Sequence, residues 1–202
     1  MLRYFHRQIR NLTTIIIVVA SASCLWQLTT AAWIQGKAIV AQELLNHAWK
    51  LTANDTQIGN EKKHRPWPWA DTWPVARLTA PRQNIELIVL AGDSGSSLAF
   101  GPGYSFASCP PNGDGLTMIS GHRDTHFSFL KELKVNDRLY LQTADSTIQY
   151  RVSDFQVVDS RTFTLPDGAD ENTLLLVTCY PFDAITPGGP LRYLVYANKQ
   201  LI

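Results

Sequence analysis

The sequence predicts an all-β-dominated domain, a barrel or sandwich of short strands, preceded by an N-terminal transmembrane helix. Two observations predict this arrangement. The 23 residues of Leu12–Ile34 contain no charged side chain, and such a stretch is long enough to cross a bilayer core of about 30 Å as a helix. From Val75 onward, short β-type runs alternate with turns rich in glycine, proline, asparagine and aspartate, which is typical of a barrel or sandwich and not of a doubly wound fold.

The charges that flank the apolar stretch predict its orientation. Three arginines precede it and a single lysine follows it closely, at Arg3, Arg7, Arg10 and Lys37. Because positive residues stay on the cytoplasmic side of a membrane, we expect the N-terminus in the cytoplasm and the rest of the chain outside it. The expected location is therefore the inner (cytoplasmic) membrane, crossed once, with the folded domain on the periplasmic or extracytoplasmic side.

Two other interpretations of this stretch stay open. A cleaved signal peptide is one, since Ala31 and Ala32 offer small residues after the apolar run, but the run is long for a signal peptide and we favour the uncleaved anchor. A lipoprotein cleavage site before Cys24 is the other. The bulky aliphatic residue expected three positions earlier is missing, so we interpret Cys24 as an apolar membrane residue.

The chain is expected to have four parts, with residues 1–11 cytoplasmic and 12–34 in the membrane. Residues 35–65 follow as a juxtamembrane helix and linker, because apolar side chains recur at near-helical spacing up to Leu51. Residues 66–202 form the folded domain. It begins with a strap in which Trp67, Trp69 and Trp73 alternate with prolines, which excludes a helix. We expect the indoles to pack on the domain, with an aromatic partner-binding surface as the alternative.

Seven strands and one short helix are predicted within the domain. The helix is expected at His126–Leu133, capped by Asp124 or Thr125. The strands are expected at Ala76–Leu78, Ile85–Ala91, Leu116–Ser120, Arg138–Gln142, Thr147–Ser160 (with an interruption), Leu174–Thr178 and Leu191–Asn198.

Charge and cysteine content exclude several functional classes. With 18 basic and 17 acidic residues the net charge is +1, which gives no electrostatic reason to expect nucleic acid. The cysteines, at 24, 109 and 179, are too few and odd in number for a disulfide-stapled fold. No CxxC or paired Cys/His spacing occurs, which argues against a structural zinc site.

Cys179 and Arg192 are the first candidates for chemistry. Cys179 ends an apolar strand, where a side chain leaves the core on a rigid scaffold. If 174–179 and 191–197 pair as antiparallel neighbours, symmetric pairing sets Cys179 opposite Arg192, with Cβ atoms about 5 Å apart. A guanidinium there could stabilise an oxyanion formed by attack of the thiol. The alternatives are an inert buried cysteine and an arginine that reaches solvent along its own stem.

His122 is the third candidate, because it follows an apolar strand and Gly121 at another strand end. A histidine can accept a thiol proton or protonate a leaving amine near neutral pH. A zinc site that joins His122 and His126 with Cys179 or Asp124 is the alternative. We disfavour it because the expected helix cap separates the two histidines, and no metal or other cofactor is expected.

These residues resemble a known family. The run Ser120–Thr125, the Thr178-Cys179 pair at a strand end and Arg192 in the last strand are similar to the His, Cys and Arg motifs of sortases, and Leu98–Gly103 resembles the segment before the histidine motif. With its anchor and tryptophan strap, the chain looks most like the proteobacterial sortases. The resemblance implies an eight-stranded β-barrel and a cysteine transpeptidase with His122, Cys179 and Arg192 as catalytic residues.

The resemblance also implies a reaction and its partners. Cys179 would attack the Thr–Gly bond of an LPxTG-like signal at the C-terminus of a secreted protein, and an amine acceptor in the cell envelope would resolve the thioester. Arg192 would steady the oxyanion while His122 acts as acid and then as base. No convincing calcium site is present, because Asp167, Asp170 and Glu171 read as a solvated turn.

Cys109 and three rival functions stay in view. Cys109 is either a spectator, which we favour, or a disulfide partner that silences Cys179. A cell-wall L,D-transpeptidase usually carries a Ser-His-Gly-Cys context, which is absent, and papain-like peptidases place cysteine before histidine in the chain. A tethered binding module would need no thiol beside an arginine.

Overall fold

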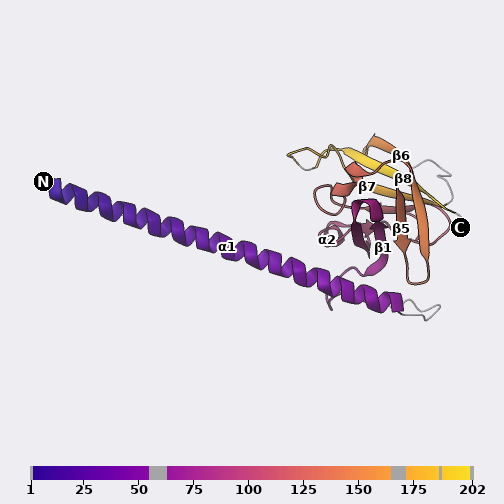
Figure 1. The fold of residues 1–202 in the computed structure, drawn as a ribbon, viewed down its shortest axis with the longest axis horizontal. Coiled ribbons are helices and arrows are strands. Elements are labelled where there is room, and N and C mark those ends of the chain that lie inside the picture. The colour runs from indigo at the N-terminus through magenta and orange to yellow at the C-terminus, as the bar shows by residue number, and fades with distance from the viewer. Residues whose placement is uncertain (1, 55–62, 165–171, 187, 201–202) are drawn as a thin grey trace. The chain divides into compact units, whose positions relative to one another are not determined.

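The computed structural model describes residues 2–54, 63–164, 172–186 and 188–200. The chain divides into two compact units, Met1–Ala41 and Gln42–Ile202, whose elements are drawn in Figure 1. The predicted acidic turn with Asp167, Asp170 and Glu171 lies outside the described residues.

The first unit consists of the helix α1, which runs over Leu2–Asn54 and continues into the second unit. In the described part of the chain, this helix is long and apolar enough from Thr13 onward to cross a membrane. Its apolar side chains from Ile15 to Val19 are exposed, as expected for a surface meant for lipid. The predicted helix over the apolar stretch, and its continuation beyond Lys37, are therefore confirmed as helix.

The last turns of α1, from Gln42 onward, are part of the second unit and pack inside it. Leu45 and Trp49, one helical turn apart, are each 1% exposed, and the Arg77 guanidinium carbon lies 5.5 Å from the centroid of the Trp49 ring. The Gln42 side-chain amide donates a 2.8 Å hydrogen bond to the Phe100 carbonyl oxygen. Residues 42–54 thus belong to the same packed body as the strands.

The tryptophan strap packs on the second unit through two of its three indoles. Trp67 meets Phe100 edge to face with ring centroids 5.0 Å apart, and Trp73 lies 6.5 Å from Phe106. Trp69 is 80% exposed. The expected packing therefore holds for Trp67 and Trp73 and not for Trp69.

The second unit is a closed barrel of eight strands in the order β1-β2-β3-β4-β7-β8-β6-β5 (Figure 1). The pairs β2–β3 and β4–β7 are parallel, and the others are antiparallel. The strands are β1 Pro74–Ala80, β2 Ile85–Ala91, β3 Gly103–Tyr104, β4 Thr117–Ser120, β5 Arg138–Gln142, β6 Thr147–Asp159, β7 Thr173–Cys179 and β8 Leu191–Lys199. The short helices are η1 Pro81–Gln83, α2 Gly95–Leu98 and η2 Ser128–Glu132.

All seven predicted strands are present. The structure differs from the prediction in one additional strand and in the type of one helix. The eighth strand, β3, is two residues long and lies where the sequence indicated a turn. The helix predicted over His126–Leu133 is instead the 3₁₀-helix η2, whose start carries no side-chain cap. The interruption expected in β6 is a register shift between Val152 and Asp154 within one continuous strand, as in a β-bulge.

Alternation along the strands separates two apolar clusters. Leu174 and Leu176 of β7 face the main core inside the barrel, with Val195 and Ala197 of β8. The residues between them on the same strands face outward, because successive side chains of a strand point to opposite faces. With residues from β4, β6 and their flanking segments, they form an outer apolar cluster. Its members are Leu116, Met118, Val158, Phe163, Leu175, Val177, Leu194 and Tyr196.

Candidate active site

Cys179 and Arg192 are directly opposed across the antiparallel pair β7–β8. The seven-residue ladder runs from Thr173 opposite Asn198 to Cys179 opposite Arg192, so the register predicted from the sequence is confirmed. Opposed residues place their Cβ atoms about 5 Å apart on one face of the sheet. A single bound carbonyl group could therefore touch both side chains.

His122 reaches the same place through the parallel pair β4–β7. Ser120 is in register with Val177, and the Gly121 N–H continues the ladder by donating a 3.0 Å hydrogen bond to the Val177 carbonyl oxygen. β4 ends at Ser120, and the same register continued by two residues would bring His122 level with Cys179. Because β7 lies between β4 and β8, Cys179 has the end of β4 on one side and Arg192 on the other, one strand spacing of about 5 Å away.

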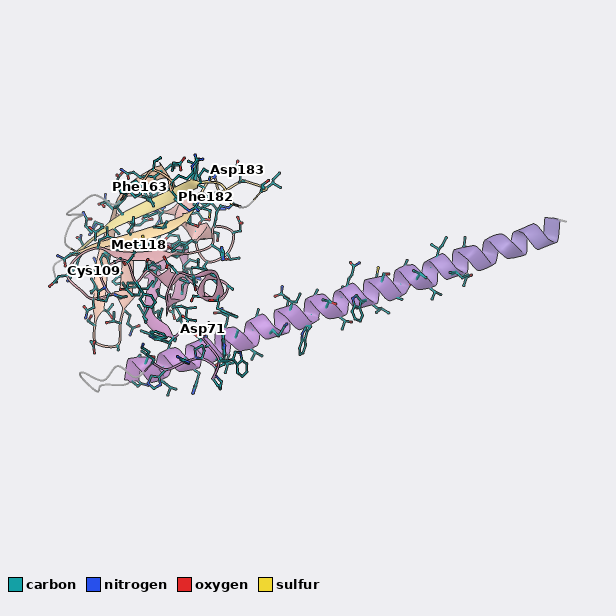
Figure 2. The ribbon with its side chains drawn as sticks, turned by 180° about the vertical axis from the view of Figure 1, so that it is seen from behind. Asp71, Cys109, Met118, Phe163, Phe182 and Asp183 are labelled. Atoms are coloured by element: carbon teal, nitrogen blue, oxygen red, sulfur yellow. The ribbon has the colours of Figure 1, made fainter. Side chains whose placement is uncertain are left out.

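The three residues share the outer face of the barrel. Cys179 is two residues beyond Val177, and Arg192 two residues before Leu194, so both continue the outer apolar cluster. Cys179 and Arg192 are half-buried, and His122 is exposed. Figure 2 shows Phe163, Phe182 and Asp183 at one end of the barrel, with Met118 further from that end. The partly exposed members Met118 and Val177 thus form an apolar floor beside the cysteine.

Arg192 bends back toward the β7–β8 loop. Its Nη1 donates hydrogen bonds of 2.7 Å to the Gly189 carbonyl oxygen and 2.9 Å to that of Leu191. Among the described residues, both partners are reached through Nη1, so the N–H donors of Nε and Nη2 are left for an incoming group. The guanidinium is therefore held in place without using its full donor set.

Two buried contacts that the sequence did not predict hold Gly121 at the end of β4, and the first of them ties it to β7. The Thr178 hydroxyl, in a side chain 2% exposed, donates a 2.7 Å hydrogen bond to the Gly121 carbonyl oxygen. Gly121 in turn lies against Phe127, whose ring would be 2.7 Å from a Cβ atom at position 121. Only glycine leaves room for this approach. The buried Phe127 thereby holds the segment that carries His122.

Arg123 and Asp124, which follow His122, form an ion pair. Arg123 Nε lies 2.7 Å from Asp124 Oδ1, and this hydrogen bond is the main reason why the pKa of Asp124 is held below its ordinary value. Asp124 is therefore engaged by Arg123, and it neither caps a helix nor approaches His126 as a metal ligand. The sequence alone could not single out Arg123, because only the fold shows that its side chain is buried.

His126 does not join the three candidate residues. Burial lowers the pKa of His126, and the charge of His122 lowers it further. Within the described residues, no three side chains of histidine, cysteine, aspartate or glutamate gather as a metal-binding group. The zinc interpretation therefore gains no support from the arrangement of these residues.

Cys109 lies at the far end of β4 from His122. Its N–H donates to the Leu116 carbonyl oxygen, whereas Thr117 is level with Leu174 of β7. Five further residues of β7 separate this level from Cys179, roughly 16 Å along the strand. A disulfide needs Cα atoms within about 7 Å, so Cys109 cannot pair with Cys179 in this fold.

Comparisons with known proteins agree with this geometry. Residues 78–200 match the family model of the sortase domain. Sortase D of Bacillus subtilis (strain 168) is 33% identical over 125 residues, which make up 60% of this chain and 62% of that protein. The chain thus spans about three fifths of that relative.

Two solved structures illustrate the likeness in fold. A sortase D5 transpeptidase of Clostridium perfringens aligns with a TM-score of 0.61 at 20% identity, covering 80% of this chain and 98% of that chain. Sortase C-1 of Actinomyces oris aligns with a TM-score of 0.54 at 26% identity, covering 64% of this chain and 74% of that one.

Proposed function

The chain belongs to the sortase family, and we propose that it is a cysteine transpeptidase that cleaves an LPxTG-like C-terminal sorting signal of secreted proteins. The observation that carries the proposal is the order of the strands. Cys179 lies on the central strand of three, with His122 level with it beyond β4 and Arg192 opposite it on β8. A nucleophile, a proton carrier and an oxyanion donor thus meet on one face.

The proposed reaction has two steps. The Cys179 thiolate attacks the carbonyl carbon of the Thr–Gly bond, and the negative charge that develops on the oxygen is stabilised by the N–H donors of Arg192. His122 gives a proton to the departing amine as the C–N bond breaks, which leaves a thioester on Cys179. An amine acceptor of the cell envelope then attacks the thioester, His122 takes up its proton, and the thiolate leaves.

The outer apolar cluster supports a peptide substrate. Val177 precedes Cys179 on the outer face of β7 and Met118 lies on the neighbouring strand, and both side chains are partly exposed. An extended segment with an apolar residue such as the leucine of LPxTG would cover this floor and bring its threonine carbonyl to the thiol. The arrangement therefore favours a peptide over a small polar substrate.

Trapping the acyl-enzyme tests the proposal. Incubation of the full chain in detergent with a sorting-signal peptide should yield a thioester on Cys179, identified by mass spectrometry of the proteolysed protein. Cys179→Ala should fold normally and lose all cleavage, whereas the matched variant Cys109→Ala, which removes another half-buried free thiol, should keep it. Cleavage that survives Cys179→Ala would sink the mechanism.

The proposed location is the inner membrane of a Gram-negative cell, with the barrel in the periplasm. It is supported by the apolar helix of the first unit and by the three arginines before it. The anchor followed by a tryptophan strap supports the proteobacterial subgroup. A periplasm-dependent reporter fused after Ile202 should be active, and an inactive fusion would reverse the orientation.

A further inference from the structure

Arg123 joins the segment that carries His122 to the segment that follows Cys179. Its Nη1 donates a 2.6 Å hydrogen bond to the Pro181 carbonyl oxygen, and its Nη2 a 2.9 Å bond to that of Ala184. We propose that Arg123 is a positioning residue, which sets the approach of His122 to Cys179 by clamping the β7–β8 loop. The inference rests on the proposed function, because it concerns the same pair of residues.

The geometry of the clamp uses the planar shape of the guanidinium. Nε and Nη2 bind the two carboxylate oxygens of Asp124 at 2.7 and 2.9 Å, while Nη1 and Nη2 reach the two loop carbonyls. One rigid fork thus holds three partners at fixed angles. The Arg123 side chain is 7% exposed, so its partners replace water, and a buried charge of this kind is costly without them.

The loop is held from a second side by aromatic packing. Tyr180 stacks on Tyr193 with ring centroids 6.1 Å apart, and Phe182 meets Tyr193 edge to face at 5.2 Å. These contacts fix the side chains of the loop, whereas Arg123 fixes its backbone carbonyls. Without Arg123, the aromatic side chains of the loop would keep their contacts with Tyr193. The backbone after Cys179 would lose its hydrogen bonds to the segment that carries His122.

Electrostatics support the same arrangement. The pKa of Arg123 is raised above its ordinary value, first by the hydrogen bond to Asp124 and, against the effect of burial, by negative charge at Asp124, Cys179 and Asp183. The charge of Arg123 and the planar shape of its guanidinium contribute separately to holding the loop. Substitution by lysine distinguishes the two, because it keeps the charge and removes the planar shape.

The test compares Arg123→Gln and Arg123→Lys with Arg82→Gln in the full chain. Arg82 is the control, because its Nη1 also binds both oxygens of a carboxylate, that of Asp137 at 2.7 and 3.0 Å, just before β5. Readouts are kcat and KM with a sorting-signal peptide, alkylation of Cys179 by iodoacetamide resolved by mass spectrometry, and hydrogen exchange of the amides at 182–186.

We expect Arg123→Gln to lower kcat roughly 10- to 100-fold with a much smaller change in KM, since misplacement of reacting groups by about 1 Å has such an effect. Exchange at 182–186 should quicken, and the rate at which iodoacetamide alkylates Cys179 should change. Arg123→Lys should fail to restore kcat, because an ammonium cannot hold three partners in one plane. Arg82→Gln should lower thermal stability and leave kcat unchanged.

Three results would overturn the inference: unchanged kcat and exchange in Arg123→Gln, full activity in Arg123→Lys, or an equal loss of kcat in Arg82→Gln. Failure of the proposed function is distinguishable, because wild type would then form no thioester with the peptide. Alkylation and hydrogen exchange need no substrate, so they would still show whether Arg123 fixes the loop and the surroundings of Cys179.

Discussion

The Thr178 hydroxyl donates a 2.7 Å hydrogen bond to the Gly121 carbonyl oxygen, one residue before Cys179 on one strand and one residue before His122 on the other. This bond lies inside the barrel, on the face opposite the candidate site. Together with the hydrogen bond from Arg123 to the Pro181 carbonyl oxygen, it holds the two parallel strands together beyond their last ladder bond. The bond therefore helps to fix the separation of the two segments that carry Cys179 and His122.

Thr178→Val should lower kcat for a sorting-signal peptide and the free energy of unfolding together. It keeps the shape of the side chain and removes the donor, which costs about 1 kcal/mol or somewhat more when a buried carbonyl is left without a partner. Thr117→Val is the matched control, because the Thr117 hydroxyl is as deeply buried and donates to the Pro110 carbonyl oxygen at 3.2 Å. Denaturant unfolding should show similar losses for both variants, and kcat should fall for Thr178→Val alone.

Arg192→Ala should act on the transition state. Removal of one oxyanion donor costs roughly 10²- to 10³-fold in kcat, and KM should change little because the substrate carbonyl carries no full charge before attack. Arg138→Ala serves as the control, since Arg138 is an exposed residue of β5, two strands from β8 in the barrel. Steady-state kinetics that show a raised KM with unchanged kcat would assign Arg192 to substrate binding instead.

The sequence was sufficient to predict the pairing of Cys179 with Arg192, because a single loop, residues 180–190, joins two strands that are consecutive in the chain, and symmetric pairing follows. It could not place His122. The position of His122 relative to Cys179 depends on a parallel pair between β4 and β7, and the chain between them passes through β5 and β6. No local pattern determines that register, so the prediction relied on the family motif.

The remaining differences also have local physical reasons. β3 escaped prediction because two residues, Gly103 and Tyr104, carry no alternation to detect. The segment before Phe129 was expected to be α-helical from its apolar spacing, but Arg123 captures the carboxylate of Asp124 that was expected to cap it. The clamp formed by Arg123 depends on carbonyl oxygens of residues 181 and 184, and backbone acceptors leave no trace in a sequence.

Trp49→Ala should destabilise the barrel although Trp49 lies in the helix that follows the apolar stretch. Trp49 is 1% exposed and lies against Arg77 of β1, and truncation of a buried tryptophan costs about 3–5 kcal/mol. Leu51→Ala is the control, because Leu51 is 44% exposed two residues further along the same helix. Calorimetry in detergent should show a clear fall of Tm for Trp49→Ala only. A Tm of Trp49→Ala equal to that of wild type would mean that this part of the helix does not stabilise the barrel.

Asp137 should make the stability of the barrel depend on pH in the acidic range. Burial alone would raise its pKa, but hydrogen bonds from Arg82, the Lys134 N–H and Gln83 outweigh burial and lower the pKa below the ordinary value of 3.8. A carboxylate with a lowered folded-state pKa stabilises the fold above its unfolded pKa, and this stabilisation is lost as the pH falls through the folded value.

Asp137→Asn should therefore be less stable than wild type at pH 7, by about 2 kcal/mol for hydrogen bonds to a charged group. The difference should shrink as the pH falls below about 4, because wild type then loses the charge as well. Glu86→Gln is the control, since Glu86 is 60% exposed in its 3.1 Å pair with Arg77 and such pairs contribute little. Denaturant unfolding of both variants from pH 7 to pH 3 measures these differences. If the difference in the free energy of unfolding between Asp137→Asn and wild type stayed constant over this range, the charge of Asp137 would not be the source of the stabilisation.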